Sequence, residues 1–160
     1  MKRTLSAILC ADLCLVVMLA GAARADIVKP NDDFYYYDDA GVMTDATRAM
    51  IYYNNVELQK ACGAQIVVAA VKTLNGLTRE DYAYRLINEW GVGDKTGNNG
   101  VVLLLAIEED DYYLTTGTGM ERHLDAGAAK AMLDKYLEPD FAKKDYDAGI
   151  RKILKRSSSA

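Results

Sequence analysis

Two segments of the chain are apolar at nearly every position and are typical of buried strands. They cover residues 64–71 and 101–107. Central strands of parallel sheets carry such runs, because helices cover them on both faces. The segment between them predicts a helix, since apolar side chains recur at helical spacing at positions 82, 83, 86, 87 and 90. Thr78 can cap this helix and Gly91 can end it, which predicts a strand–helix–strand crossover with parallel strands.

A helix is also predicted ahead of the first strand. It begins at Thr44 or Asp45, which are good capping residues, and it ends before Gly63. Ile51 lies on its apolar face. Asn55 interrupts that face at a position where an apolar residue is expected.

The second half of the chain predicts a hairpin and two more helices. Residues 112–116 follow an acidic turn and form an antiparallel partner of the preceding strand. The next helix is capped by Asp125 and runs to a break at Pro139. A last short helix carries apolar side chains at positions 146, 150, 153 and 154.

These elements predict an α/β fold, a three-layer α/β/α sandwich with a small mixed sheet. The sheet combines the parallel strand–helix–strand unit with the antiparallel hairpin strand. The domain covers residues 26–154, with residues 27–37 as an extended lead-in and residues 155–160 as a disordered tail.

Residues 1–25 are typical of a signal peptide. Lys2 and Arg3 precede an apolar run, and small residues at positions 23 and 25 suit cleavage before Asp26. An uncleaved membrane anchor is the alternative, but the apolar run is short for a bilayer core of about 30 Å. We therefore expect an exported protein, periplasmic or extracellular, with no direct membrane span after cleavage.

Composition excludes several kinds of function. Cleavage removes three of the 19 basic and one of the 23 acidic residues, which leaves a net charge of −6 and argues against nucleic acid as a partner. His123 is the sole histidine, and the serines of the mature part lie only at positions 157–159, so a Ser-His-Asp triad is excluded. Cys62 is the single cysteine after cleavage and is predicted to be a small buried hydrophobe.

Carboxylates and amides beside glycines are the remaining candidates for a site. Asp38 precedes Gly41, Asp94 and Asn99 belong to a polar loop that enters the second apolar strand, and Glu121 follows a glycine-rich turn. Because the hairpin is antiparallel, Asp94 and Glu121 should lie at one edge of the sheet, and we expect Asp38 to join them in one shared polar site. Oxygen ligands of this kind suit Ca²⁺ or Mg²⁺. A purely structural role remains open for each residue, such as an Asx turn at Asp38 or a cap at Glu121.

Several motifs resemble those of the TPM domain family, in the order in which the family has them. The most specific is the tryptophan–glycine–acid–lysine loop with its later Asn-Gly, over residues 88–101. Others lie at residues 38–42, 63–68, 81–83, 116–121, 139–141 and 146–149. The resemblance covers residues 34–154, nearly the whole mature chain.

The resemblance implies an extracytoplasmic α/β/α domain of bacterial envelopes or of the thylakoid lumen, where one member assists repair of photosystem II. Divalent-cation binding and a weak acid-phosphatase activity are attributed to plant members of the family, and the resemblance suggests them here. By position, Asp38, Asp94, Asn99 and Glu121 match the polar cleft residues of the family.

Three functions follow as expectations. The first is a non-enzymatic accessory or quality-control module that binds Ca²⁺ or Mg²⁺ and presents its cleft to an envelope or membrane protein. The second is a metal-dependent phosphatase, in which Asp94 and Glu121 hold the metal, Lys95 offsets charge and Asp38 positions water. The third is a protein that binds a partner through a surface rich in tyrosine, with seven tyrosines at positions 35–37, 52, 53, 112 and 113.

Overall fold

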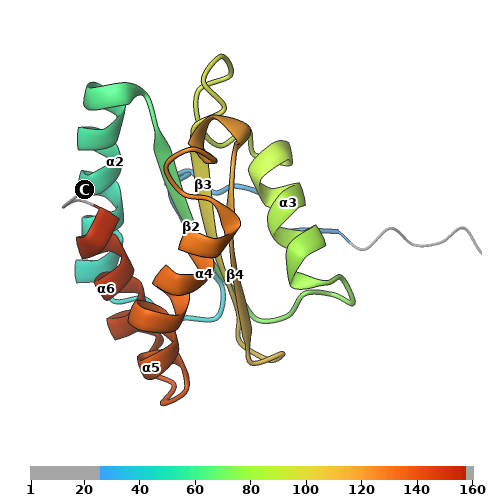
Figure 1. Cartoon of the computed structure of the whole chain (residues 1–160). Helices are drawn as coiled ribbons and strands as arrows, with labels where there is room; N and C mark the ends of the chain where they lie inside the picture. The colour runs from blue at the N-terminus through green and yellow to red at the C-terminus, as the bar shows by residue number, and fades with distance from the viewer. Residues whose placement is uncertain (1–25, 158–160) are drawn as a thin grey trace, which may run out of the picture.

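A four-stranded mixed sheet forms the middle layer of the molecule (Figure 1). The computed structural model describes residues 26–157, so the predicted signal peptide and residues 158–160 of the predicted tail lie outside the described residues. The strands are β1 (Tyr36–Asp38), β2 (Gln65–Val71), β3 (Gly100–Ala106) and β4 (Asp111–Thr116), in the order β1-β2-β3-β4. β1, β2 and β3 are parallel and β4 is antiparallel to β3, which confirms the predicted mixed sheet.

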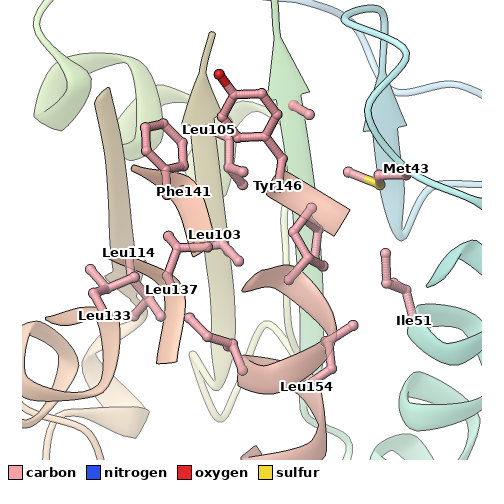
Figure 2. Close-up of a cluster of buried hydrophobic side chains, with 14 of the residues drawn as sticks. Met43, Ile51, Leu103, Leu105, Leu114, Leu133, Leu137, Phe141, Tyr146 and Leu154 are labelled. Carbon is pink, nitrogen blue, oxygen red and sulfur yellow. The ribbon is translucent and has the colours of Figure 1, made fainter. Parts of the chain in front are cut away.

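Helices cover both faces of the sheet. α3 (Arg79–Glu89) packs on one face, against the side chains of Val67, Ala69 and Leu104. The other face lies under α2 (Asp45–Cys62), α4 (Ala126–Met132), α5 (Glu138–Phe141) and α6 (Tyr146–Ser157). Figure 2 shows the core on this side, where Leu103 and Leu105 of β3 meet apolar side chains of the helices. The predicted three layers are therefore confirmed.

The predicted helix starts are also confirmed. The side chain of Thr44 accepts a hydrogen bond from the amide of Thr47, and that of Thr78 accepts one from the amide of Asp81. α2 ends at Gly63, which has the left-handed conformation that glycine adopts at low cost. Within residues 26–157, no helix is long and apolar enough to cross a membrane.

The helix that begins at Asp125 does not break at Pro139. α4 passes into a π turn, η3 (Leu133–Leu137), and then into α5. Pro139 lies in the first turn of α5, where the missing amide hydrogen has little cost. The predicted break is therefore wrong, because a π turn ahead of the proline lets the chain continue as a helix.

Both ends of the domain contain more regular structure than the sequence predicted. β1 lies within and just after the expected lead-in, and its backbone pairs with residues 68–70 of β2. Its three residues are half-buried and it follows Pro30, so it lacks the apolar run of a central strand. α6 continues to Ser157, so the predicted tail begins inside a helix.

Asn55 links α2 to the sheet and explains the gap in the apolar face of that helix. Its side chain is fully buried. The amide nitrogen Nδ2 donates to the carbonyl oxygens of Ile51 and Ile66, at 2.9 and 2.8 Å, and Oδ1 accepts from the amide of Ile66 at 2.8 Å. Because β1 reaches only residue 68 of β2, the backbone of Ile66 has no strand partner on that side. Asn55 supplies the missing hydrogen bonds.

We expect Asn55→Leu to lower the free energy of unfolding by about 1–3 kcal/mol, because it leaves the partly buried backbone amide and carbonyl of Ile66 without partners. Urea unfolding followed by circular dichroism measures the change. Gln59→Ala, an exposed position on the same helix, is the matched control and should change stability by less than about 0.5 kcal/mol. Equal effects of the two substitutions would contradict the role given to Asn55.

Candidate functional site

Three of the predicted site residues belong to one edge of the sheet. Asp94 and Asn99 lie in the loop between α3 and β3. Gly100, the first residue of β3, pairs with Gln65, the first residue of β2, and the neighbouring Val101 pairs with Thr116, the last residue of β4. The short turn η2 (Thr118–Met120) follows β4, and Glu121 follows it. We call residues 93–99 together with residues 116–121 the polar edge.

The loop of the polar edge is shaped by the side chain of Asp94. Its Oδ2 accepts hydrogen bonds from the amides of Thr96 and Gly97, at 3.1 and 2.8 Å. The amide of Asp94 donates in turn to Oδ1 of Asn99 at 2.8 Å. These hydrogen bonds hold the loop in one conformation. Asp94 and Asn99 therefore have the structural role that the sequence left open as an alternative.

Two contacts fix the loop to the rest of the domain. Nδ2 of Asn99 donates to the carbonyl oxygen of Cys62, the last residue of α2, at 3.0 Å. The amide of Gly93 donates to Oε1 of Gln65 at 2.8 Å. Both ends of the Asn99 side-chain amide are thus engaged inside the protein. The sequence does not point to Gln65 as part of this edge, because it is a single polar residue at the start of an apolar run.

The two parts of the polar edge meet backbone to backbone. The amide of Gly119 donates to the carbonyl oxygen of Asn98 at 3.0 Å, and a side chain at position 119 would overlap the carbonyl oxygen of Gly97. A side chain at position 117 would likewise overlap the carbonyl oxygen of Asn98. Glycine is required here because the two chains approach too closely for a Cβ atom.

A depression with a volume of about 420 Å³ opens beside these loops, on the face of the sheet that α3 covers. Asp94, Lys95 and Asn98 line one side of it, and Thr116 and Thr118 line the other. The side chains of Asp94 and Lys95 are exposed, so water screens their charges. Glu121 is exposed too, but it is not part of the lining.

The fit of this edge to a divalent cation is partial. Oδ1 of Asp94 accepts no hydrogen bond within the described residues, and Glu121 is an exposed carboxylate of the other loop of the polar edge, so each of the two can offer an oxygen. Asn99 fits less well, because its amide already holds the loop. Within residues 26–157, no three or more acids, histidines or cysteines come together as metal ligands. Backbone carbonyls and water would have to complete the six to eight ligands that Ca²⁺ takes.

Asp38 lies at the opposite edge of the sheet and does not join Asp94 and Glu121. It is the last residue of β1 and pairs with Ala70, five residues along β2 from Gln65. That separation corresponds to roughly 16 Å along the strands. The predicted convergence of the three acids is corrected, because β1 ends at the carboxyl edge of the parallel strands whereas the loop of Asp94 enters at their amino edge.

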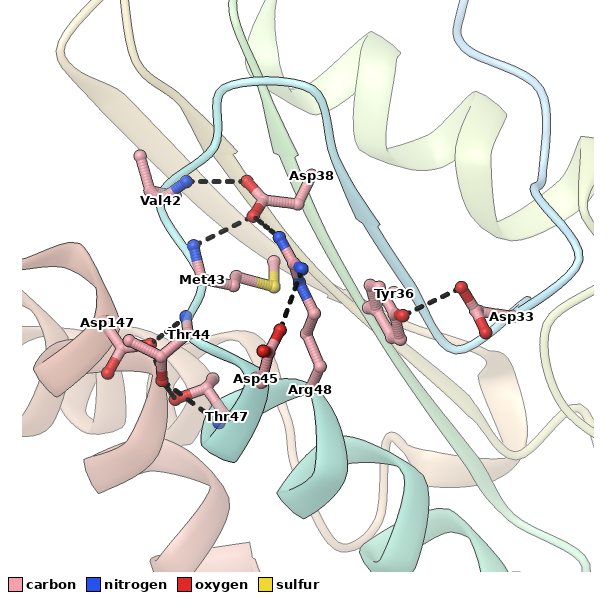
Figure 3. A network of polar contacts seen from close by, with 10 residues as sticks. All are labelled: Asp33, Tyr36, Asp38, Val42, Met43, Thr44, Asp45, Thr47, Arg48 and Asp147. Carbon is pink, nitrogen blue, oxygen red and sulfur yellow. Dashed lines mark hydrogen bonds and ion pairs between the residues drawn. The ribbon is translucent and has the colours of Figure 1, made fainter.

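The surroundings of Asp38 give it a structural role (Figure 3). Its carboxylate is 2% exposed and accepts hydrogen bonds from the amides of Val42 and Met43, both at 2.9 Å. Arg48 of α2 donates to the same carboxylate at 3.0 Å. The hydrogen bond with Asp38 raises the pKa of the Arg48 guanidinium, although burial acts to lower it. This network fixes the turn between β1 and α2.

The cysteine and the histidine of the described residues both lie at the surface. Cys62 is exposed, so the prediction that it is buried is wrong. It is the last residue of α2, with Sγ 3.5 Å from the carbonyl oxygen of Leu58. His123 is exposed as well.

The tyrosine-rich surface is smaller than the sequence suggested. Tyr52 and Tyr53 of α2 are exposed, with their rings 5.7 Å apart, and Tyr35 packs edge-on against Tyr52. The remaining tyrosines of the predicted surface, at positions 35–37, 112 and 113, are half-buried.

Comparison with known proteins assigns the family. A family model described as the TPM domain matches residues 36–160. The chain belongs to the TPM domain family. No curated protein matches the chain.

Solved structures of similar fold include proteins from three bacteria. The N-terminal domain of a P. gingivalis protein has a TM-score of 0.69 at 22% identity, with 76% of this chain and 78% of that chain covered. The N-terminal domain of the cg2496 protein from Corynebacterium glutamicum has a TM-score of 0.61 at 17% identity, over 84% of this chain and 88% of that one. The BA42 protein from Bizionia argentinensis has a TM-score of 0.58 at 13% identity, over 71% and 77%. At these identities the likeness concerns the fold alone.

We expect Asp38→Asn in this TPM domain to lower the free energy of unfolding by about 1–3 kcal/mol, since the charged partner of Arg48 and of two amides is lost. Urea unfolding measures the loss. Asp45→Asn is the matched control, because Asp45 contacts the same arginine but is 99% exposed, and it should cost less than about 0.5 kcal/mol. Similar losses in both variants would contradict the structural role of Asp38.

Gly119→Ala should loosen the polar edge, because the added methyl group forces Gly97 and Asn98 away. We expect a loss of about 1–3 kcal/mol and faster amide hydrogen exchange at residues 97–99. Thr118→Ala, next to it and exposed, should change neither by a comparable amount. Unchanged exchange at residues 97–99 in Gly119→Ala would refute the close approach.

Proposed function

We propose that this TPM domain is an exported accessory module, not an enzyme, that binds a divalent cation weakly at the polar edge. The ion would be Ca²⁺ or Mg²⁺, held by Asp94 and Glu121 with backbone carbonyls and water. In this proposal the ion links the two loops, and the polar edge with its bound ion is presented to an envelope or membrane protein.

The observation that carries the proposal is the state of the Asp94 carboxylate. One oxygen is committed to the amides of its own loop, and the other, Oδ1, accepts no hydrogen bond within the described residues. The loop is already fixed by Asn99 and Gln65, so a cation finds its first ligand in place without ordering a mobile segment. Placement of this kind lowers the entropic cost of binding.

The exposure of the edge supports weak binding. A site with two exposed carboxylates resembles the extracellular calcium modules, whose dissociation constants are on the order of 10⁻⁴–10⁻³ M. An exported protein meets calcium at such concentrations more readily than a cytosolic one. The export itself rests on residues 1–25, which have the sequence pattern of a signal peptide.

The phosphatase is the weaker proposal. It assigned water positioning to Asp38, which is buried against Arg48 at the other edge of the sheet. Asp94 and Lys95 still line one depression together, but no described histidine or serine lines it with them. Turnover of p-nitrophenyl phosphate that is lost in Asp94→Asn would favour the phosphatase over the accessory module.

Calcium should stabilise the wild-type protein and not the Asp94→Asn variant. For a dissociation constant of about 1 mM, about 10 mM Ca²⁺ adds roughly 1.4 kcal/mol, which raises the melting temperature by a few degrees. Asparagine retains an acceptor for the amides of Thr96 and Gly97 but lacks the charge that a cation requires. Thermal melts with CaCl₂, MgCl₂ and EDTA measure the shift.

Asp110→Asn is the matched control, since it removes one exposed acid at the hairpin turn of the opposite edge. It should keep the calcium shift of the wild type. A shift that survives in Asp94→Asn, or no shift in the wild type at millimolar calcium, would overturn the proposed cation site.

A further inference from the structure

A second cavity lies on the other side of the sheet and has the opposite character. Its volume is about 530 Å³, within the range of roughly 300–1,000 Å³ that holds small molecules in proteins. It lies between the sheet and the helices α2, α4 and α6, which cover this face in Figure 1. It shares no lining residue with the polar depression. We call it the apolar cleft.

The interior of the apolar cleft is continuous with the hydrophobic core. Val68 of β2 and Leu103 of β3 form its floor and are at most 1% exposed. Leu154 of α6, also 1% exposed, lies on one wall, and Ala131 and Met132 of α4 lie on the other. The feature is therefore a recess that leads into the core and not a flat apolar patch.

Polar groups occur only at the entrance. The charged or ionisable side chains in the lining are His123, Lys135 and Tyr136, and no aspartate or glutamate is among them. This is notable in a chain with a net charge of −4. Lys135 is exposed, with Nζ 5.0 Å from the centre of the Tyr136 ring. The apolar cleft thus combines an apolar interior with a cationic entrance.

The backbone of the entrance is unusual as well. Lys135 and Tyr136 both lie in η3, the π turn. π turns are rare, and they occur frequently at functional sites. Flexible side chains complete the entrance, since Met120 and Met132 lie on its two sides, and methionine adapts its shape to a bound apolar group.

We propose that the apolar cleft binds a single fatty acid, with the acyl chain in the recess and the carboxylate at Lys135 and His123. This function is separate from the cation site proposed above and does not depend on it. A carboxylate matches the entrance because its charge is opposite to that of Lys135 and it accepts hydrogen bonds from both side chains.

An unbranched acyl chain fits the interior better than a peptide segment does. A peptide would bring backbone amides and carbonyls into the recess, and they would need partners there. β2 and β3 are paired with neighbouring strands along the floor, and the wall side chains are apolar. An acyl chain has no such polar groups to satisfy.

Calorimetric titration of the full chain with fatty acids below their micelle-forming concentrations tests the proposal. Dodecanoate should bind saturably with one site. Each methylene group buried adds affinity by about fourfold, so decanoate should bind roughly 16-fold more weakly than dodecanoate. Absence of saturable binding by dodecanoate, or affinities that do not depend on chain length, would overturn the proposal.

Two variants locate the ligand. Ala131→Trp should abolish binding, because the indole fills the cleft from the wall of α4. Ala126→Trp is the matched control on the same helix, exposed and outside the lining, and it should bind as the wild type does. Binding that survives in Ala131→Trp, or is lost equally in both variants, would overturn the site.

The head group is tested with a neutral ligand of the same length. Lys135→Gln should weaken dodecanoate by about threefold and leave dodecanol unchanged, because only the carboxylate interacts with the charge. Equal effects on the two ligands would overturn the assigned orientation.

As a readout that needs no variant, methyl NMR signals of Met120 and Met132 should shift on addition of dodecanoate to the wild type, and unshifted signals would refute binding in the cleft.

Discussion

The hydrogen bonds between Asn55 and Ile66 are the constraint on which the polar edge depends. β1 is too short to pair with the first half of β2, and the Asn55 side chain takes the place of the missing strand. The same contact fixes α2 against the sheet. Since the last residue of that helix accepts the hydrogen bond of Asn99, the helix position is transmitted to the loop of Asp94. A buried amide at one end of the sheet thus supports an exposed carboxylate beyond its edge.

Asp38 and Asp94, which the sequence predicted to share one site, differ in burial and therefore in role. Asp38 is buried, and its carboxylate accepts hydrogen bonds from two amides of the β1–α2 turn and from Arg48. Its charge therefore stabilises the fold. Asp94 uses one oxygen to shape its loop and exposes the other. The first residue is a structural element, whereas the second combines a structural role with the capacity to bind.

Local patterns in the sequence predict most of the fold, since they reflect forces that act between near neighbours. The caps at Thr44, Thr78 and Asp125 and the apolar strands β2 and β3 are all present. β1 was missed because a short, half-buried edge strand has no apolar run to reveal it. Because β1 was not predicted, the sequence could not show that Asp38 lies at the carboxyl edge of the parallel strands. The prediction of one site shared by three acids was wrong for that reason.

Other features depend on contacts between distant segments and left no local signal. Asn55 looked like a defect until its partner, the backbone of a strand 11 residues away, was known. Gln65 looked like an ordinary polar residue at a strand start, although it holds the amide of Gly93, 28 residues away. The π turn ahead of Pro139 has no recognisable local pattern, and a proline alone predicts a break.

The contact between Gly119 and Gly97 constrains how such a protein can diversify. Two loops whose backbones touch form a joint of fixed dimensions, so an insertion in one displaces the other and disrupts both. Lys95 and Thr96 lie outside that joint and are exposed. A new binding specificity at this edge would therefore arise by substitution of a few exposed side chains, while the backbone of the two loops stays the same.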